Sequence, residues 1–290
     1  MGRDRSWWSL TLEPLAENRE RLEAVLHDAG CAGIWEQEPA ADGRARITAY
    51  FPGRPPAGPE KLAWWPAAAE LTAGRPELDE VAERDWFKEW RENFAPAPLT
   101  DKTLVIPAWM EPEEGENRLV LKIYPGQGFG TGTHESTQLA ASLLEEELSR
   151  RPSRPDNLLD VGTGSGILAI LAARRGVKRI TALDIDPDAL ANARENLAHN
   201  RVEEYVTLSR RPLAEITESY DLVVANIVAP VLRELVGCFP ARLNPGGCLI
   251  LSGMLPDQAA ELARSCTALG LVCNPRRQLG EWSAFSCRKP

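Results

Sequence analysis

Residues 158–170, LLDVGTGSGILAI, constrain the fold of this chain more strongly than any other segment. A short apolar run that carries Asp160 leads into glycines at every second position from Gly162 to Gly166, and a second apolar run follows. Glycine allows a tight backbone turn and lets a ligand approach without a Cβ in the way. The segment therefore predicts a buried strand, a ligand-binding turn and a helix. Ile167 stands where a dinucleotide-binding fingerprint needs glycine, which disfavours NAD.

The rest of residues 99–290 continues this pattern of short apolar segments separated by helical ones. The predicted strands are LVLKIY, NLLDVG, RITALDI, YDLVVAN and CLILSG, at residues 119–124, 157–162, 179–185, 220–226 and 248–253. Helical segments include ESTQLAASLLEEEL and DALANARENLAHN, and LVCNPRRQL and WSAFSCRK form a closing pair of strands. Strands that alternate with helices imply an α/β domain whose parallel sheet is covered on both faces.

Residues 1–84 follow a different pattern. Alternation and helical spacing predict, in chain order, a strand, a helix, two strands, a helix and a strand. These elements lie at residues 7–13, 16–29, 31–38, 45–51, 60–74 and 78–84. The order is that of ferredoxin-like domains, in which both helices lie on one face of a small sheet. Pro66 must start or kink the second helix.

A short helix should join the two domains. In DWFKEWRENF (85–94), Trp86, Trp90 and Phe94 lie four residues apart and form one aromatic face that must pack against something. The Ala-Pro-Ala-Pro run that follows supports a domain boundary. We therefore expect a linker over residues 85–98.

The spacing of the glycine-rich turn, G-x-G-x-G after a strand that ends in an acid, resembles the first motif of class I methyltransferases that use S-adenosylmethionine. An ordinary turn between a strand and a helix is the alternative. The next predicted strand ends at Asp184, 22 residues after Gly162, where a carboxylate can accept hydrogen bonds from two ribose hydroxyls. Asp184 could instead cap the following helix, but we assign that cap to Asp186, with Pro187 in the first turn.

Asn226 ends the predicted strand 220–226 and so reaches the same carboxyl edge of the sheet. The Ile-Val-Ala-Pro sequence after it is a poor turn, which favours a binding role. Methyl transfer to an amine needs mainly positioning, but the amine must be neutral. For lysine, neutrality at pH 7 costs about 4 to 5 kcal/mol. The amide oxygen of Asn226, with a backbone carbonyl, can accept the amine hydrogens and orient the lone pair, so no strong base is required.

A second glycine-rich segment, PGQGFGTGTHESTQ, spans residues 125–138. Alternating glycines suit a loop that folds over a ligand, and the start of the following helix offers free N–H groups for a carboxylate. Thr137 adds a hydroxyl in the first turn, and His134 lies at the junction. The alternative is a helix cap on a connector.

Together these segments resemble the PrmA family, the bacterial methyltransferases of protein eleven of the large ribosomal subunit. The resemblance rests on PGQGFGTGTHEST, GTGSG, LDIDP and ANIVA, and it extends to DWFKEWRENFAP, LVIPAW and LNPGGCLILSGML. It therefore covers almost the whole chain. Gly128, Ser136 and Thr163 replace residues that are usual in the family, and none of these changes removes a ligand-bearing group.

The resemblance implies a Rossmann-like, seven-stranded methyltransferase domain and a ferredoxin-like amino-terminal domain that holds the ribosomal protein. It implies that Thr137, Gly162, Asp184 and Asn226 contact S-adenosylmethionine and that Asn226 also lies beside the acceptor amine. Nothing in the sequence predicts a metal site. It further implies N-methylation of lysine side chains and of an α-amino group. Methylation of another protein, a small molecule or RNA by the same fold stays open, as does a non-catalytic binding module.

The charge of the chain favours a basic protein over a nucleic acid as partner. The net charge is −9, and residues 1–100 contribute 12 Lys and Arg against 18 Asp and Glu, which is −6 of that total. Surfaces that follow phosphates are usually strongly basic, whereas an acidic surface suits a basic protein. Eight of the nine tryptophans lie in the first 109 residues, so the two ends of the chain are built differently.

The sequence also predicts a cytoplasmic protein, monomeric and without a membrane partner. No apolar run reaches the roughly 18 residues that a membrane span needs, and no signal-peptide pattern begins the chain. The six cysteines include no C-x-x-C pair and have no nearby histidine. We therefore expect reduced, buried thiols, with neither a zinc site nor a disulfide.

Overall fold

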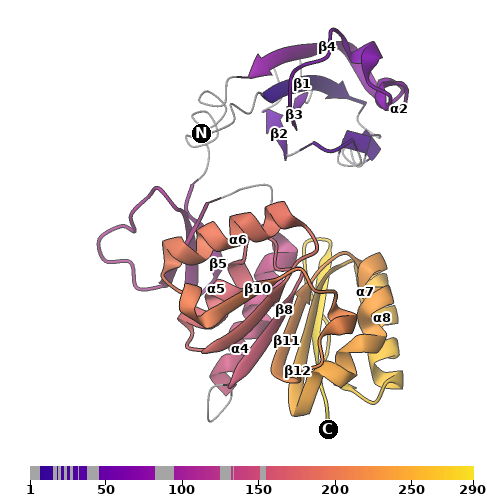
Figure 1. Ribbon diagram of the computed structural model, residues 1–290. Helices are drawn as coiled ribbons and strands as arrows, with labels where there is room; N and C mark the ends of the chain where they lie inside the picture. Colours follow the sequence, from indigo (N-terminus) through magenta and orange to yellow (C-terminus); the bar gives the residue numbers. More distant parts are fainter. Residues whose placement is uncertain are drawn as a thin grey trace. The chain divides into compact units, whose positions relative to one another are not determined.

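The computed structural model describes residues 7–15, 18, 21–22, 25–26, 29–31, 33–37, 46–81, 95–124, 132, 134–150 and 155–290 (Figure 1). The chain forms two compact units, Met1–Phe94 and Ala95–Pro290. The linker helix expected at 85–94, and most of the glycine-rich segment at 125–133, lie outside the described residues.

The smaller unit is built on a four-stranded antiparallel sheet. Its strands are β1 (Trp7–Pro14), β2 (Gly33–Gln37), β3 (Arg46–Pro52) and β4 (Thr72–Val81), in the order β2-β3-β1-β4. The first and third strands are central, as in ferredoxin-like domains, which confirms the predicted fold of this part. Arg21, Leu22, Val25 and Leu26 are helical, within the segment expected to form the first helix.

The second helix of this unit is shorter than the sequence predicts. In place of one helix over 60–74 there is a 3-10 turn, η1 (Pro59–Lys61), and then a short helix, α2 (Trp65–Ala69). Pro66 lies in the first turn of α2, where its missing N–H leaves no hydrogen bond unmade. Because proline is not tolerated inside a helix, it separates the two pieces. The following strand, β4, then begins at Thr72 rather than at Leu78.

Tryptophan rings form part of the core of the smaller unit. Trp8 is buried and stacks on Phe51 with 4.4 Å between ring centroids, and Phe51 stacks on Trp64 at 5.4 Å. The apolar side chains packed with them are Leu10, Leu12, Leu22, Leu26, Ile47, Ala49, Ala68 and Leu71. Large rings supply much buried area in a domain too small for an extensive aliphatic core. Trp35 differs, because its side chain is 43% exposed.

The larger unit contains an eight-stranded sheet in the order β10-β9-β8-β11-β12-β15-β13, with β14 paired to β15. The parallel strands are β8 (Asn157–Val161), β9 (Arg179–Leu183), β10 (Val206–Ser209), β11 (Tyr220–Asn226) and β12 (Leu243–Met254). The antiparallel ones are β13 (Val272–Cys273), β14 (Arg277–Leu279) and β15 (Trp282–Arg288). The parallel sheet covered by helices is confirmed, but it has eight strands where the resemblance implies seven, and β10 is a strand that the sequence analysis does not predict.

Helices cover both faces of this sheet (Figure 1). They are α4 (Glu135–Arg150), α5 (Ile167–Arg174), α6 (Pro187–Asn200), α7 (Ala229–Leu235) and α8 (Pro256–Ala268), with 3-10 turns η2 (Glu203–Tyr205), η3 (Leu213–Glu215) and η4 (Val236–Arg242). Successive strand residues point to opposite faces. Leu158 therefore packs in the core with α4, α5 and α6, whereas Leu159 packs in the core with α7 and α8. None of the helices in the described residues is long and apolar enough to cross a membrane.

The segment LVLKIY does not join the main sheet, contrary to the sequence prediction. As β7 (Leu119–Ile123) it pairs in parallel with β6 (Thr103–Pro107), which pairs antiparallel with β5 (Ala97–Thr100). The side-chain amide of Asn200 on α6 bonds both backbone groups of Lys122, at 2.9 and 2.6 Å. A helix side chain thus satisfies polar groups that a neighbouring strand of the main sheet would otherwise bond.

Two of the cysteines expected to be reduced are joined to each other. Strands β13 and β15 are paired so that Cys273 lies directly opposite Cys287. A disulfide connects these two residues, which are 14 positions apart in the sequence. The prediction of no disulfide is wrong here, because spacing along the chain does not tell which residues a strand register brings together. Cys31, Cys238, Cys248 and Cys266 form no disulfide.

Candidate active site

The glycine-rich turn after β8 has a backbone that only glycine adopts readily. Gly162, Gly164 and Gly166 have φ angles of 73°, 54° and 84°. The N–H of Gly162 donates to the carbonyl of Leu183 at 2.8 Å, and a Cβ on Gly162 would lie 2.8 Å from Cγ1 of Ile227. The end of β9 and the residue after β11 therefore fix the shape of the turn, and a side chain at position 162 would not fit.

Asp184 follows β9 and holds the glycine-rich turn with its carboxylate. Oδ2 accepts the N–H of Gly164 at 2.9 Å, and Oδ1 accepts the N–H of Asp186 at 3.1 Å. Each carboxylate oxygen has a second acceptor position, and the side chain is only half-buried. The cap of α6 is Asp186, whose side chain accepts the N–H of Asp188 at 2.9 Å, as predicted. Asp184 thus keeps the capacity to accept hydrogen bonds from a ligand.

Asn226, the last residue of β11, contacts Thr137 at the start of α4. Its Nδ2 donates to Oγ1 of Thr137 at 3.1 Å, and Thr137 is buried. Oδ1 of Asn226 is also buried and has no hydrogen-bond partner among the described residues. A buried amide oxygen without a partner is costly, unless a ligand supplies the missing donor. The structure therefore brings two of the predicted site residues together and leaves one acceptor atom open.

The residues around His134 fix the start of α4. The N–H of Ser136 donates to Nδ1 of His134 at 3.2 Å, and the carbonyl of Ser136 accepts from Oγ of Ser252 on β12 at 2.7 Å. The His134 ring meets Trp282 edge to face, with 4.7 Å between centroids. Burial lowers the pKa of His134, which favours the neutral ring. These contacts agree with the helix-cap alternative for His134 itself.

Asn196 on α6 is a residue of this region that the sequence analysis missed. It is fully buried, and its Oδ1 accepts the N–H of Tyr124 at 2.6 Å, while Nδ2 donates to the carbonyl of Ser165 at 2.9 Å. It thereby links the residue before the glycine-rich segment 125–133 to the glycine-rich turn. The available signal was the four-residue spacing of Asn192, Asn196 and Asn200, which places three amides on one helix face.

Asp160, at the end of β8, is a fully buried acid below the turn. Its Oδ2 accepts from Oγ1 of Thr163 at 2.7 Å, whereas its Oδ1 has no partner among the described residues. Burial raises the pKa of Asp160 to about 7, and the negative charge of Asp184 adds to this rise. At neutral pH the site therefore contains an acid that is only partly ionised.

Replacing Asp160 by asparagine should flatten the pH dependence of stability. An aspartate in the unfolded chain ionises near pH 4, but Asp160 in the folded chain ionises at about pH 7. Between pH 4 and pH 7 the folded state binds a proton that the unfolded state has already lost. The free energy of unfolding therefore falls as pH rises through this range, by up to about 1.4 kcal/mol per pH unit, and Asp160 causes no further fall above pH 7. Urea unfolding of both proteins at pH 5, 6, 7 and 8 measures the difference. The exposed Asp156→Asn serves as control, and parallel curves for wild type and Asp160→Asn would contradict the assignment.

The site lies where ligands bind in open α/β sheets. The chain runs from β8 outward to β9 and β10, and then returns to β11 and β12 on the other side, so the strand order reverses between β8 and β11. Ligands of such sheets bind at the carboxyl ends of the strands at this point. A glycine-rich turn, a carboxylate with spare acceptor positions and an amide oxygen without a partner among the described residues all lie there. These residues fit S-adenosylmethionine, which has ribose hydroxyls and an amino-acid end.

Comparison with known proteins gives the same family over nearly the whole chain. A model described as ribosomal protein L11 methyltransferase (PrmA) matches residues 6–290. The chain is 32% identical to the ribosomal protein L11 methyltransferase of Trichlorobacter lovleyi over an alignment of 300 positions, which covers 98% of each protein. It is 38% identical to that of Pelobacter propionicus over 220 residues, which cover 76% of this chain and 71% of the relative.

Among solved structures, the chain is similar to the ribosomal protein L11 methylase from Lactobacillus delbrueckii subsp. bulgaricus. The two share 30% sequence identity with a TM-score of 0.62, and the match covers 68% of this chain and all of the other. Family model, full-length relative and solved structure agree. The chain belongs to the PrmA family of ribosomal protein L11 methyltransferases, which are class I enzymes that use S-adenosylmethionine.

Proposed function

We propose that this protein transfers methyl groups from S-adenosylmethionine to lysine side chains, and to an α-amino group, of ribosomal protein L11. Membership of the PrmA family supports the methyl donor and the protein substrate. The choice of an amine as acceptor rests on Oδ1 of Asn226. This atom is buried at the carboxyl edge of the sheet and has no hydrogen-bond partner among the described residues.

Four residues are proposed to hold the cofactor. Gly162 contacts it through the backbone of the tight turn, Asp184 accepts its ribose hydroxyls, and Thr137 and Asn226 lie at its amino-acid end. The start of α4 adds N–H groups that suit a carboxylate. When bound, the cofactor supplies a methyl group attached to a positively charged sulfur.

Asn226 is the residue proposed to orient the acceptor. Its Oδ1 can accept one hydrogen of a neutral amine, which leaves the nitrogen lone pair directed away from the amide. The hydrogen bond from Nδ2 to Thr137 fixes the amide plane, so the oxygen rather than the NH₂ group is the atom left without a partner among the described residues. A fixed acceptor of this kind aligns the amine without extracting a proton. Deprotonation is aided by the low polarity of the site, which lowers the pKa of a lysine.

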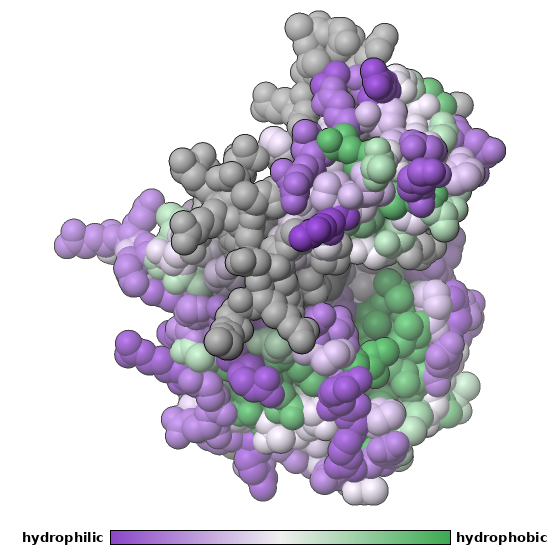
Figure 2. All heavy atoms as spheres, turned by 45° about the horizontal axis from the view of Figure 1, so that its top comes forward, coloured by the Kyte–Doolittle hydropathy of each residue, from purple (hydrophilic) through white to green (hydrophobic). Residues whose placement is uncertain are grey.

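Exposed apolar side chains border the proposed site. Ile185, next to Asp184, is 77% exposed, and it offers a surface on which an adenine ring can pack. Val228 and Leu255, just after β11 and β12, are 53% and 43% exposed. Hydrophobic side chains also gather on the larger unit in the lower part of Figure 2. Such a border suits the four methylene groups of a lysine that reaches Asn226.

The smaller unit is proposed to bind the ribosomal protein. Residues 1–100 carry a net charge of −6, which complements a basic substrate and would increase the rate of encounter with it. Contacts between exposed charges are screened by salt. Salt should therefore weaken substrate binding more than cofactor binding.

Mass spectrometry of a reconstituted reaction tests this proposal. Purified enzyme, isotopically labelled S-adenosylmethionine and a mixture of ribosomal proteins and rRNA are incubated together, and the products are separated before peptide mapping. We expect label on lysine residues and on the α-amino group of L11, and none on rRNA. The Asn226→Ala variant gives the background. Label on another protein or on rRNA, with none on L11, would refute the proposed substrate, and label confined to other side chains of L11 would refute lysine as acceptor.

A further inference from the structure

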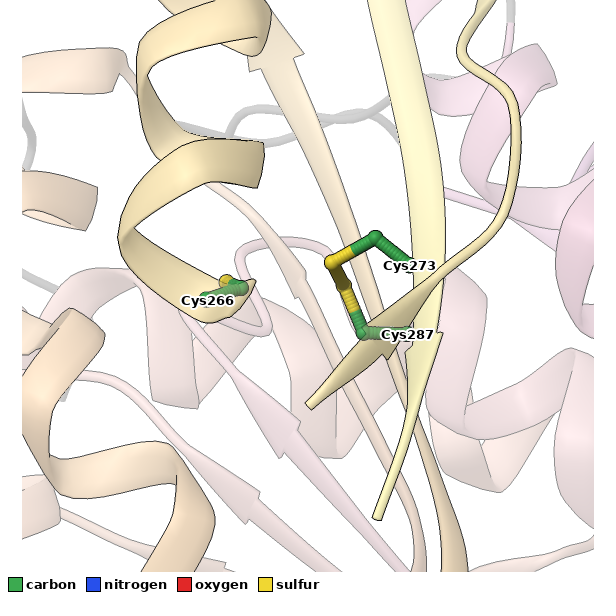
Figure 3. Close-up of side chains that lie close together, drawn as sticks. All are labelled: Cys266, Cys273 and Cys287. Atoms are coloured by element: carbon green, nitrogen blue, oxygen red, sulfur yellow. A yellow bond between two sulfur atoms is a disulfide. The ribbon is translucent and has the colours of Figure 1, made fainter. Parts of the chain in front are cut away.

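Three cysteine sulfurs lie together at the end of the larger unit, away from the residues assigned to methyl transfer. Sγ atoms of Cys266, Cys273 and Cys287 are all within 4.8 Å of one another. Figure 3 shows that they come from helix α8 and from the two neighbouring strands β13 and β15. This is the one such group of potential metal ligands found among the described residues.

We propose that Cys266, Cys273 and Cys287, once the disulfide is reduced, bind one thiophilic metal ion such as Zn²⁺. Spacing along the chain does not reveal this site, because its ligands follow no metal-binding pattern and come together only in the folded structure. The site is independent of the proposed methyltransferase reaction.

The sulfur positions fit the size of a zinc site. A Zn–S bond of about 2.3 Å in a tetrahedral arrangement places neighbouring sulfurs about 3.8 Å apart. The separations of at most 4.8 Å need only small side-chain movements to reach this value, once Cys273 and Cys287 are no longer bonded. Three thiolates select soft or borderline ions such as Zn²⁺ over Mg²⁺ and Ca²⁺, which prefer oxygen ligands.

The surroundings bury two of the sulfurs and leave the third beside a surface groove. Cys266 and Cys287 are fully buried in an apolar core, which shields the metal–sulfur bonds from water. Cys273 lines a shallow surface groove that also contains Thr267 and Asn274, so water or a polar side chain can take a fourth position. Zinc with three thiolates carries a net charge of −1, and Arg264 and Arg276 line the same groove with positive charge.

A metal ion would connect elements that the disulfide does not. The disulfide joins β13 to β15, which are already hydrogen-bonded neighbours. The third sulfur belongs to α8, and no hydrogen bond to it is found among the described residues. An ion bound to all three would attach this helix to the closing strands.

Cobalt(II) titration of the full chain tests the proposal. The protein is fully reduced with a phosphine, its six thiols are counted, and Co²⁺ is added without oxygen. We expect one Co²⁺ per chain, with sulfur-to-cobalt charge-transfer absorption that Zn²⁺ abolishes. The same protein with the Cys273–Cys287 disulfide intact is the matched control, and it should give no such absorption, because only one ligand is left.

Variants identify the ligands. Cys266→Ser should weaken Co²⁺ binding at least about tenfold, because loss of even an outer partner of a metal ligand typically costs that much. Cys238→Ser, outside the cluster, should leave binding unchanged. Absence of the charge-transfer band in the fully reduced chain overturns the proposal. A band of equal strength in the oxidised chain or in Cys266→Ser also overturns the proposal. If a variant fails to fold, the comparison of oxidised with reduced wild-type protein still decides.

Discussion

Replacing Asn226 by alanine should lower kcat for methyl transfer about 100-fold and change the Kd of S-adenosylmethionine much less. Misplacement of a reacting group by about 1 Å costs this order of rate. The variant loses the open Oδ1 acceptor and the Nδ2 contact with Thr137, but keeps the glycine-rich turn and Asp184, which carry most of the proposed cofactor contacts. Steady-state kinetics at saturating cofactor, with calorimetry of cofactor binding, separate the two quantities.

Two further variants sharpen this experiment. Thr137→Val keeps the shape of Thr137 but removes the acceptor for Nδ2, so the amide of Asn226 can turn, and kcat should fall by an intermediate factor. Asn117→Ala, on an exposed loop of the same unit, should behave as wild type. If Asn226→Ala turned over at the wild-type rate, or lost activity only through weaker cofactor binding, Asn226 would not be the group that orients the acceptor.

Replacing Asp184 by alanine should weaken S-adenosylmethionine binding at least about 100-fold. A hydrogen bond to a charged group contributes about 1.5 to 3 kcal/mol, and two hydroxyls would lose such a bond. The substitution also removes the acceptor for the N–H of Gly164 and so loosens the glycine-rich turn. Isothermal titration calorimetry of the cofactor with both proteins measures the change directly.

Replacing Asp184 by asparagine separates the contribution of the ribose hydrogen bonds from that of the hydrogen bond with Gly164. It keeps an oxygen for the N–H of Gly164 but loses the charge and one acceptor, so its binding should lie between those of wild type and alanine. Asp156→Ala removes an exposed carboxylate just before β8, at the opposite edge of the sheet, and should leave affinity unchanged. Wild-type affinity in Asp184→Ala would exclude the ribose assignment.

The sequence predicts much of the site because parallel strands end at a common edge. Asp184 follows one apolar strand and Asn226 ends another, so the pattern places both at the carboxyl edge of the sheet. The structure adds that their strands, β9 and β11, lie on the two sides of β8. The helix cap at Asp186 is predicted for a similar local reason, since proline and acidic residues mark a helix start. That these residues bind the cofactor stays a prediction, which the variants above test.

Other features depend on contacts between distant segments, which local patterns do not encode. β7 reads as one more strand of the main sheet, yet it pairs with β6 and with amides of α6. The amide of Asn196 is recognisable as functional only once Tyr124 and Ser165 lie on either side of it. The pairing of Cys273 with Cys287 needs the strand register, and 14 intervening residues give no sign of it.

The order of strands in the larger unit has a consequence for how this part of the chain is made. Strand β15 lies between β12 and β13, although both of these precede it in the sequence. Until residues 282–288 have been synthesised, β12 has one unpaired edge and β13 has no strand to pair with. Exposed strand edges favour association with other chains. The glycine-rich turn, Asp184 and Asn226 are therefore translated well before the sheet that supports them can close, and completion of this unit has to follow synthesis of its last strand.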